Sequence, residues 1–285
     1  MDIYALLSRL PIRRFQEPPP VVAVLRLSGV IGGLGPLRSG LTLSGLAGQI
    51  ERAFETKRVK AVALSINSPG GSPVQSSLIA QRIRDLAQEK DVPVIAFTED
   101  VAASGGYWLA CAADEIYANE NSIVGSIGVI SAGFGFQELI QRFGVERRVH
   151  TAGEKKAILD PFREEDPKDV KRLEAIQKDI HESFKDLVRS RRGDRLSAPE
   201  KTVFTGEFWT GRRALELGLV DGFGELRQVM RQRYGEKVKF RKIEGKRNWW
   251  RRRLNLETDL TMPGDWAASL IAAVEERSLW SRFGL

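Results

Sequence analysis

The sequence is poor in the residues that build disulfides and metal sites. Among its 285 residues it has one cysteine, Cys111, and two histidines, His150 and His181. A single cysteine cannot form an intramolecular disulfide, and it excludes a zinc site built on cysteine ligands. We therefore expect no metal and no other cofactor.

Long apolar runs are also missing. No segment supplies the ~18–20 consecutive apolar residues that a membrane-spanning helix needs. The apolar start of the chain is interrupted by Arg9, Pro11, Arg13 and Arg14, which argues against a secretory signal. We expect a soluble chain that stays in the cytoplasm.

The excess of positive charge is local. Lys and Arg outnumber Asp and Glu by 44 to 37, and residues 241–253 alone hold seven basic residues against one Glu. So local an excess does not indicate a nucleic-acid-binding surface across the protein, and we expect no nucleic-acid partner. With 42% hydrophobic and 28% charged residues, the composition is that of an ordinary globular protein.

Strand and helix patterns alternate over the first 140 residues. Apolar runs predict strands at residues 21–27, 61–66, 92–97, 116–118 and 123–130, and helical spacing predicts helices at 44–56, 73–89 and 104–113. A strand-like stretch also covers residues 145–150. The alternation favours an α/β fold with a largely parallel sheet.

The second half of the chain changes character. Residues 167–192 predict one long charged helix with a single apolar stripe, made of Val170, Leu173, Ile176, Ile180, Phe184 and Leu187. We divide the chain into an N-terminal arm (1–20), a main domain (21–235) and a basic, Trp-rich C-terminal extension (236–285). Trp249–Arg253 and the apolar run Trp266–Val274 suit an interfacial membrane anchor; the alternative is a tail that packs on the protein.

Two glycine pairs occur where a strand gives way to a helix. The first is Gly70-Gly71, and the second, Gly105-Gly106, directly follows Ser104. Glycine allows a positive φ and leaves backbone N–H groups uncovered, and such a turn at a helix N-terminus can bind an oxyanion. Ser104 is either an N-cap or a nucleophile approached by a substrate.

A nucleophilic serine needs a base. His181 falls on the long charged helix and His150 ends a strand-like stretch, so neither has a fixed relation to Ser104. Lysine can serve instead when burial lowers its pKa from about 10.4. Lys156 precedes an apolar stretch, which favours its being drawn inward while Lys155 stays solvated.

At this point the sequence resembles the signal peptide peptidase A family of serine peptidases, in its short single-unit form. Five segments match in family order and span roughly residues 20–230: 66–71, 103–107, 124–129, 153–161 and 211–221. The resemblance implies a Clp/crotonase-type spiral of ββα units with a long helix. It implies no cofactor.

The resemblance also assigns roles to individual residues. Ser104 matches the family's nucleophile and Lys156, 52 residues later, its general base. Ser126 matches a serine that orients the lysine. The oxyanion hole would be formed by the first glycine turn and the second, with candidates Gly70, Gly71 and Gly105.

Further implications concern partners. The family's substrates are apolar peptides such as remnant signal peptides, and its lysine reaches the serine of a neighbouring protomer, so a ring-shaped homo-oligomer is expected. Family members usually carry an N-terminal transmembrane anchor that this sequence does not display. Any contact with the inner membrane would therefore be peripheral, through the C-terminal extension.

Three other readings stay open. A Clp-like Ser-His-Asp peptidase would need a histidine soon after Ser104, but none occurs before His150. A crotonase-type acyl-CoA enzyme shares the glycine oxyanion hole and has no need of Ser104. A non-enzymatic binder would use the basic tail on membranes or nucleic acid, with binding that falls steeply with salt.

Overall fold

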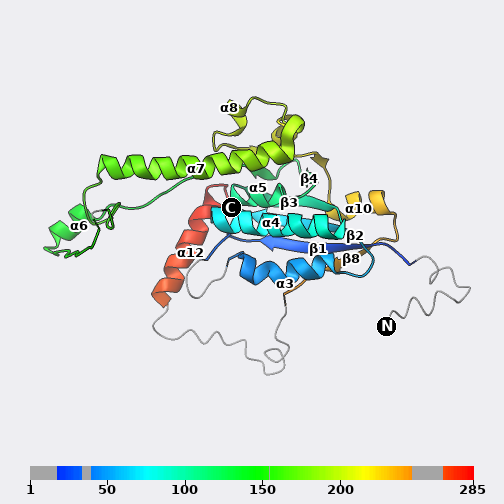
Figure 1. Ribbon diagram of the computed structural model, residues 1–285, viewed down its shortest axis with the longest axis horizontal. Helices are drawn as coiled ribbons and strands as arrows, with labels where there is room; N and C mark the ends of the chain where they lie inside the picture. Colours follow the sequence, from blue (N-terminus) through cyan, green and yellow to red (C-terminus); the bar gives the residue numbers. More distant parts are fainter. Residues whose placement is uncertain (1–17, 34–39, 154, 246–265) are drawn as a thin grey trace, which may run out of the picture.

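The computed structural model describes residues 18–33, 40–153, 155–245 and 266–285. Its centre is an eight-stranded sheet in the order β6-β5-β3-β2-β1-β8, with β4 paired to β3 and β7 paired to β4 (Figure 1). The strands are β1 (Val21–Ser28), β2 (Val59–Ser68), β3 (Val94–Ala103), β4 (Glu115–Ala118), β5 (Ile123–Gly125), β6 (Phe208–Thr210), β7 (Gly222–Phe223) and β8 (Lys239–Lys242). Every pairing is parallel except that of β5 with β6, which confirms the predicted α/β fold.

Helices cover both faces of this sheet. The helices of the described residues are α3 (Leu43–Phe54), α4 (Pro73–Lys90), α5 (Gly105–Ala110), α6 (Gln137–Arg142), α7 (Pro167–Arg192), α8 (Glu200–Val203), α9 (Gly211–Glu216), α10 (Leu226–Tyr234) and α12 (Trp266–Ser281), with a 3-10 turn at Gly193–Arg195. The larger core lies between the sheet and α3, α4 and α5. A smaller core on the opposite face packs Val229 and Met230 of α10 against Ala61, Ala63 and Ile95.

The central strands are apolar on both faces because both faces are covered. In β1, Val22, Ala23 and Leu25 are fully buried, which is the pattern expected of a strand inside a parallel sheet. Helix α4 begins at Pro73, and the hydroxyl of Ser72 caps it by accepting from the amide of Gln75. These signals place the Gly70-Gly71 turn at the end of β2, immediately before α4.

Two predicted strands differ in the structure. Strand β5 ends at Gly125, well short of residue 130, because Ser126 adopts a left-handed φ of 54° that ends a strand. Residues 145–150 form no strand and are exposed. Beyond residue 235, β8 pairs with β1, so the sheet also includes the first part of the predicted C-terminal extension.

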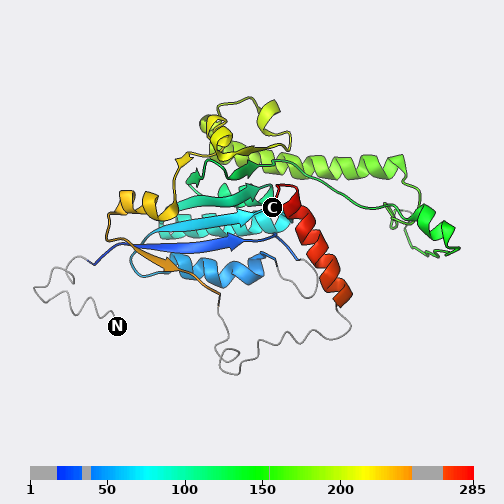
Figure 2. The ribbon, with the colours of Figure 1, turned by 180° about the vertical axis from the view of Figure 1, so that it is seen from behind.

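A long arm projects from the body. We define the arm as residues 130–166, including α6, and both ribbon views show it beyond the N-terminal end of α7, away from the sheet (Figure 1, Figure 2). Seven large apolar side chains of the arm are exposed: Ile130, Phe134, Phe136, Leu139, Phe143, Val145 and Val149. No core of the described chain covers them.

Helix α7 carries the arm and is buried only in its C-terminal half. Its buried side chains are Phe184, Val188 and Arg192, whereas Ile176 of the predicted apolar stripe is 50% exposed. Phe184 stacks on Trp108 of α5 with ring centroids 4.6 Å apart. The N-terminal half of α7 therefore extends past the body.

The chain end returns to the body next to β6. After α12, the ring of Phe283 lies edge-on to Phe208, with centroids 5.0 Å apart. None of the helices in the described residues is long and apolar enough to span a membrane. Trp249–Arg253, part of the suggested anchor, lies outside those residues.

Candidate active site

Ser104 lies where β3 gives way to α5. Its φ of 52° is one that residues with a side chain rarely adopt, and its amide donates to the carbonyl of Gly125 at 2.8 Å. Ser104 occupies the N-cap position of α5, but its hydroxyl makes no capping hydrogen bond. Because backbone strain concentrates at functional sites, the position suits a nucleophile held on a fixed support.

The first glycine turn packs directly on this serine. A Cβ on Gly70, where φ is 103°, would lie 2.8 Å from the Cβ of Ser104 and 2.9 Å from the amide nitrogen of Gly105. On Gly71 a Cβ would lie 2.0 Å from the carbonyl oxygen of Ile31. Only glycine fits at either place, and the absent side chains bring the two turns together.

The free amides of the turns distinguish Gly70 from Gly71. The N–H of Gly70 donates to the hydroxyl of Ser68 at 3.2 Å. Gly105 is the first residue of α5, so its N–H has no partner within the helix. Neither it nor the N–H of Gly71 finds an acceptor in the part of the chain described. Gly71 and Gly105 thus offer the two donors, and Gly70 provides the close approach.

Ser126 shares a cavity with Ser104. The cavity has a volume of about 250 Å³. Its lining, drawn from distant parts of the chain, is Ser104, Ser126, Gly128, Val129, Ile130, His181, Thr205, Gly206 and Arg282. Ser126 is 7% exposed, and its amide donates to the carbonyl of Glu207 at 2.7 Å. The structure therefore brings together Ser104, Ser126 and the glycine turns.

His181 also lines this cavity. The sequence analysis did not predict this position for His181. Its Nε2 lies 3.0 Å from the carbonyl oxygen of Ile127, the residue after Ser126. A signal existed in the sequence, because His181 precedes Phe184 and Val188 at helical spacing. His150, by contrast, lies exposed on the arm.

Lys156 is not part of the cavity within one chain. It lies on the arm between α6 and α7 and is exposed, as Lys155 is, and its amide closes a turn to the carbonyl of Gly153 at 3.1 Å. The neighbouring Ala157 and Ile158 are only partly buried and do not draw it inward. A single chain therefore holds the serine and leaves the lysine on a projecting segment.

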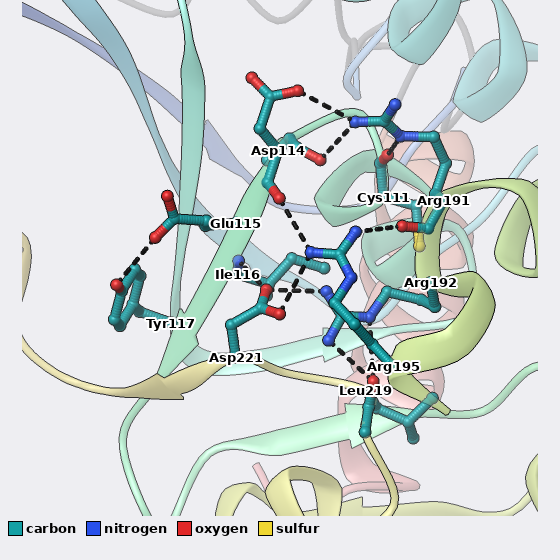
Figure 3. Close-up of polar contacts among 12 residues, drawn as sticks. Cys111, Asp114, Glu115, Ile116, Tyr117, Arg191, Arg192, Arg195, Leu219 and Asp221 are labelled. Carbon is teal, nitrogen blue, oxygen red and sulfur yellow. Dashed lines mark hydrogen bonds and ion pairs between the residues drawn. The ribbon is translucent and has the colours of Figure 1, made fainter. Parts of the chain in front are cut away.

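The wall of the cavity formed by α7 is fixed by an arginine network at the end of that helix (Figure 3). Arg192, whose side chain is 2% exposed, lies 2.7 Å from a carboxylate oxygen of Asp221 and donates twice to the carbonyl of Gly218 at 2.9 and 2.8 Å. Arg195 contacts the other carboxylate oxygen of Asp221 at 3.2 Å. Arg191 bonds the carbonyl of Cys111 at 2.9 Å.

The buried charge of Arg192 is paired with an ionised carboxylate. Burial opposes ionisation of Asp221, but the bonds from Arg192 and from the amide of Ile116 outweigh it and hold the pKa of this carboxyl below its usual value. Burial raises the pKa of the Cys111 thiol to about 12, so this cysteine is protonated at neutral pH and is not a nucleophile.

A larger cleft of the described chain lacks the residues predicted for the site. A cleft of about 630 Å³ lies at the sheet and is lined by Phe97, Glu99 and Phe240 among others, but by none of the predicted site residues. Among the residues described, no group of three or more His, Cys, Asp and Glu side chains could hold a metal ion. The chemistry is therefore best sought at Ser104.

Comparison with known proteins finds relatives that match most of this chain. A relative from Brucella abortus named Na(+)/H(+) antiporter NhaA is 49% identical over 98% of this chain and 39% of its own length. The chloroplastic serine protease SPPA of Arabidopsis thaliana is 33% identical over 73% of this chain and 31% of its own. Protease 4 of Haemophilus influenzae is 31% identical over 79% of this chain and 36% of its own. The chain thus spans well under half the length of each.

One structural neighbour and one family profile complete the comparison. A mutant of the 1510-N membrane-bound stomatin-specific protease aligns with 80% of this chain and 99% of its own, at 16% identity and a TM-score of 0.49. The profile of peptidase family S49 matches residues 86–239, more than half of the chain, including Ser104, Ser126 and Lys156. The chain belongs to peptidase family S49.

Proposed function

We propose that this chain is a serine endopeptidase that uses Ser104 as nucleophile and Lys156 as general base. Its substrates are apolar peptides such as remnant signal peptides. The observation that carries the proposal is a strained serine with an unbonded hydroxyl, packed against two glycine turns whose Gly71 and Gly105 N–H groups have no acceptor among the described residues. Membership of family S49 supports it.

The chemistry follows from this arrangement. Neutral Lys156 takes the proton of Ser104, whose Oγ attacks the scissile carbonyl carbon. The N–H groups of Gly71 and Gly105 stabilise the oxyanion of the tetrahedral intermediate, each by about 3 kcal/mol. The protonated lysine then gives its proton to the leaving amine. A water deprotonated by the same lysine attacks the acyl-enzyme and frees Ser104.

The base would come from a neighbouring copy of the chain. Among the residues described, no lysine lines the cavity that holds Ser104, and Lys156 lies on the projecting arm. Contact with a neighbour would also bury the lysine, and loss of water favours its neutral form. Ser126 faces the same cavity and would orient the incoming lysine.

The arm supports a ring-shaped homo-oligomer. It exposes seven large apolar side chains, and apolar patches of this kind mark interaction surfaces. Packing the arm of one copy on the body of the next is a head-to-tail contact, which closes into a ring when the rotation permits. Each ring interface would then complete one active site.

We place the enzyme in the cytoplasm, with peripheral contact to the inner membrane. The composition of the C-terminal extension supports such contact. So does the Brucella abortus relative, in which a segment matching this chain belongs to a protein named as a Na(+)/H(+) antiporter. Apolar peptides left in a membrane would be substrates within reach.

Hydrolysis of a fluorogenic apolar peptide by four proteins tests the dyad. We expect Ser104→Ala and Lys156→Ala to fall to background while Lys155→Ala, the adjacent exposed lysine, keeps most of the wild-type rate. A serine-directed fluorophosphonate should label Ser104 in a peptidase and not in an acyl-CoA enzyme. Normal rates in Lys156→Ala would refute the lysine base.

A further inference from the structure

His181 occupies the point where α7 first meets the body. Towards the N-terminus the helix extends past the body, with Ile176 50% exposed. Towards the C-terminus it is anchored by Phe184, stacked on Trp108, and by buried Val188. His181 belongs to the same stripe, one turn before Phe184, and its side chain is partly buried. It is thus the first of these body contacts along the helix that carries the arm.

The partner of His181 adjoins the orienting serine. The imidazole Nε2 lies 3.0 Å from the carbonyl oxygen of Ile127, and Ile127 is fully buried directly after Ser126. A carbonyl oxygen only accepts hydrogen bonds, so Nε2 carries the proton and donates it. This nitrogen is therefore engaged and cannot accept the proton of Ser104.

The segment around Ser126 is also held by main-chain hydrogen bonds and by the burial of Ile127 in the larger core. On one side the amide of Ser104 holds the carbonyl of Gly125 at 2.8 Å. The amide of Ser126 reaches the carbonyl of Glu207 at 2.7 Å, and that of Gly128 folds back on Ser126 at 2.9 Å. From Ile130 onward the chain is exposed and enters the arm. Among the described residues, the bond from His181 is the hydrogen bond that joins this segment to α7.

We propose that His181 is a positioning residue that fixes Ser126 against the motion of the arm. The left-handed φ of 54° at Ser126 is disfavoured for a serine, so it persists only while its surroundings enforce it. By holding the carbonyl of Ile127, His181 keeps the hydroxyl of Ser126 on the cavity that also holds Ser104. This inference rests on the proposed function, in which Ser126 orients the lysine.

Two substitutions of equal length separate the hydrogen bond from the packing. His181→Gln keeps a side-chain N–H donor, and His181→Met fills the space without one. We expect kcat in His181→Met to fall about fivefold to tenfold, the scale of one intramolecular hydrogen bond, with little change in KM because the loss concerns chemistry rather than binding. His181→Gln should recover most of kcat. Ser183→Ala, on the exposed side of the same turn, is the control and should match wild type.

Two readouts keep folding and function apart. End-point labelling with a fluorophosphonate counts the active sites to which each kcat refers. Amide hydrogen exchange of residues 126–130 should be faster in His181→Met than in wild type and restored in His181→Gln, and this measurement needs no activity.

The outcomes that refute the inference are distinct from those that refute the proposed function. Wild-type kcat and exchange in His181→Met would overturn the positioning role of His181 alone. A His181→Gln as slow as His181→Met, with normal exchange, would also overturn it, because the imidazole itself would then be required. A wild-type chain that neither hydrolyses peptide nor reacts with the fluorophosphonate would instead refute the peptidase proposal. Hydrogen exchange would still test whether His181 restrains the segment around Ser126.

Discussion

At Gly70 the proposed nucleophile, Ser104, and the first glycine turn pack closely together because one side chain is missing. The close approach places the main chain of the turn against Ser104 and the amide of Gly105. Gly106 repeats the arrangement, since a Cβ there would lie 2.5 Å from the carbonyl oxygen of Ser68. Each glycine turn thus admits the backbone of the other, and this packing fixes the main chain that carries the proposed oxyanion donors.

Replacing Gly70 by alanine should therefore remove activity beyond any effect of backbone strain. Its new Cβ would push on Ser104 and Gly105, and we expect kcat to fall on the order of 10²-fold, as for loss of one oxyanion donor. Gly29→Ala is the matched control, because Gly29 has a similar φ of 109° and open space around a Cβ. Peptide hydrolysis and thermal melting of both variants check this; equal losses of activity in the two would contradict it.

The sequence predicted some features of these residues and not others. Glycine pairs at strand ends predicted the turns, since few other residues tolerate such backbone. Which N–H is free was not predictable, because it depends on the hydroxyl of Ser68 taking the amide of Gly70. The role of His181 was missed for a similar reason: its partner is a main-chain carbonyl 54 residues away, which carries no side-chain signature.

Among the elements, α7 connects the cavity that holds Ser104 to the arm. Its C-terminal end is held by Arg192 and Asp221, the latter from the loop before β7. Periodicity predicted the length of this helix correctly, from Pro167 to Arg192. It did not predict which half is buried, because an apolar stripe shows that a partner exists and not whether that partner lies in the same chain. The exposed Ile176 is an example.

Asp221→Asn should destabilise the fold by about 3 kcal/mol, because it leaves the buried Arg192 without its counter-charge. The folded-state pKa of Asp221 lies below its usual value of 3.8. The stabilisation is therefore complete at neutral pH and is lost as the pH falls through and below that value. Chemical denaturation at several pH values should show the gap between wild type and variant closing in acid.

Glu120→Gln is the control for this prediction. It removes the counter-charge of Arg212, whose side chain is 72% exposed, and exposed pairs contribute little to stability. A gap between wild type and Asp221→Asn that persisted unchanged at acidic pH would contradict the ionised role of Asp221.

At the scale of the whole molecule, one chain does not bring the proposed catalytic residues together. Ser104, Ser126 and the proposed oxyanion donors lie in the body, and Lys156 lies on the arm with seven exposed apolar side chains. From the sequence alone, the apolar residues after Lys156 predicted an inward lysine. That reasoning assumed that the apolar residues after Lys156 pack in the core of the same chain. In the structure the arm does not pack on that core, so Lys156 stays exposed.

If a neighbour supplies the lysine, two inactive variants should restore activity when they are mixed. In a head-to-tail ring each site combines Ser104 of one copy with Lys156 of the next. Random assembly of equal amounts of Ser104→Ala and Lys156→Ala chains would pair an intact serine with an intact lysine at about one site in four. Co-refolded mixtures should therefore recover about a quarter of wild-type activity.

Two measurements show whether recovered activity, or its absence, reports on a site shared between two copies of the chain. Native mass spectrometry must show that mixed assemblies form. A mixture of Lys156→Ala with the double variant Ser104→Ala/Lys156→Ala contains intact Ser104 but no Lys156. It should stay inactive, and activity in it would reveal contamination by wild type. Mixed assemblies without recovery would mean that each arm folds back on its own body, and the exposed apolar residues of the arm would then need a different partner. Recovery confined to mixed assemblies would make the oligomer, and not the chain, the catalytic unit.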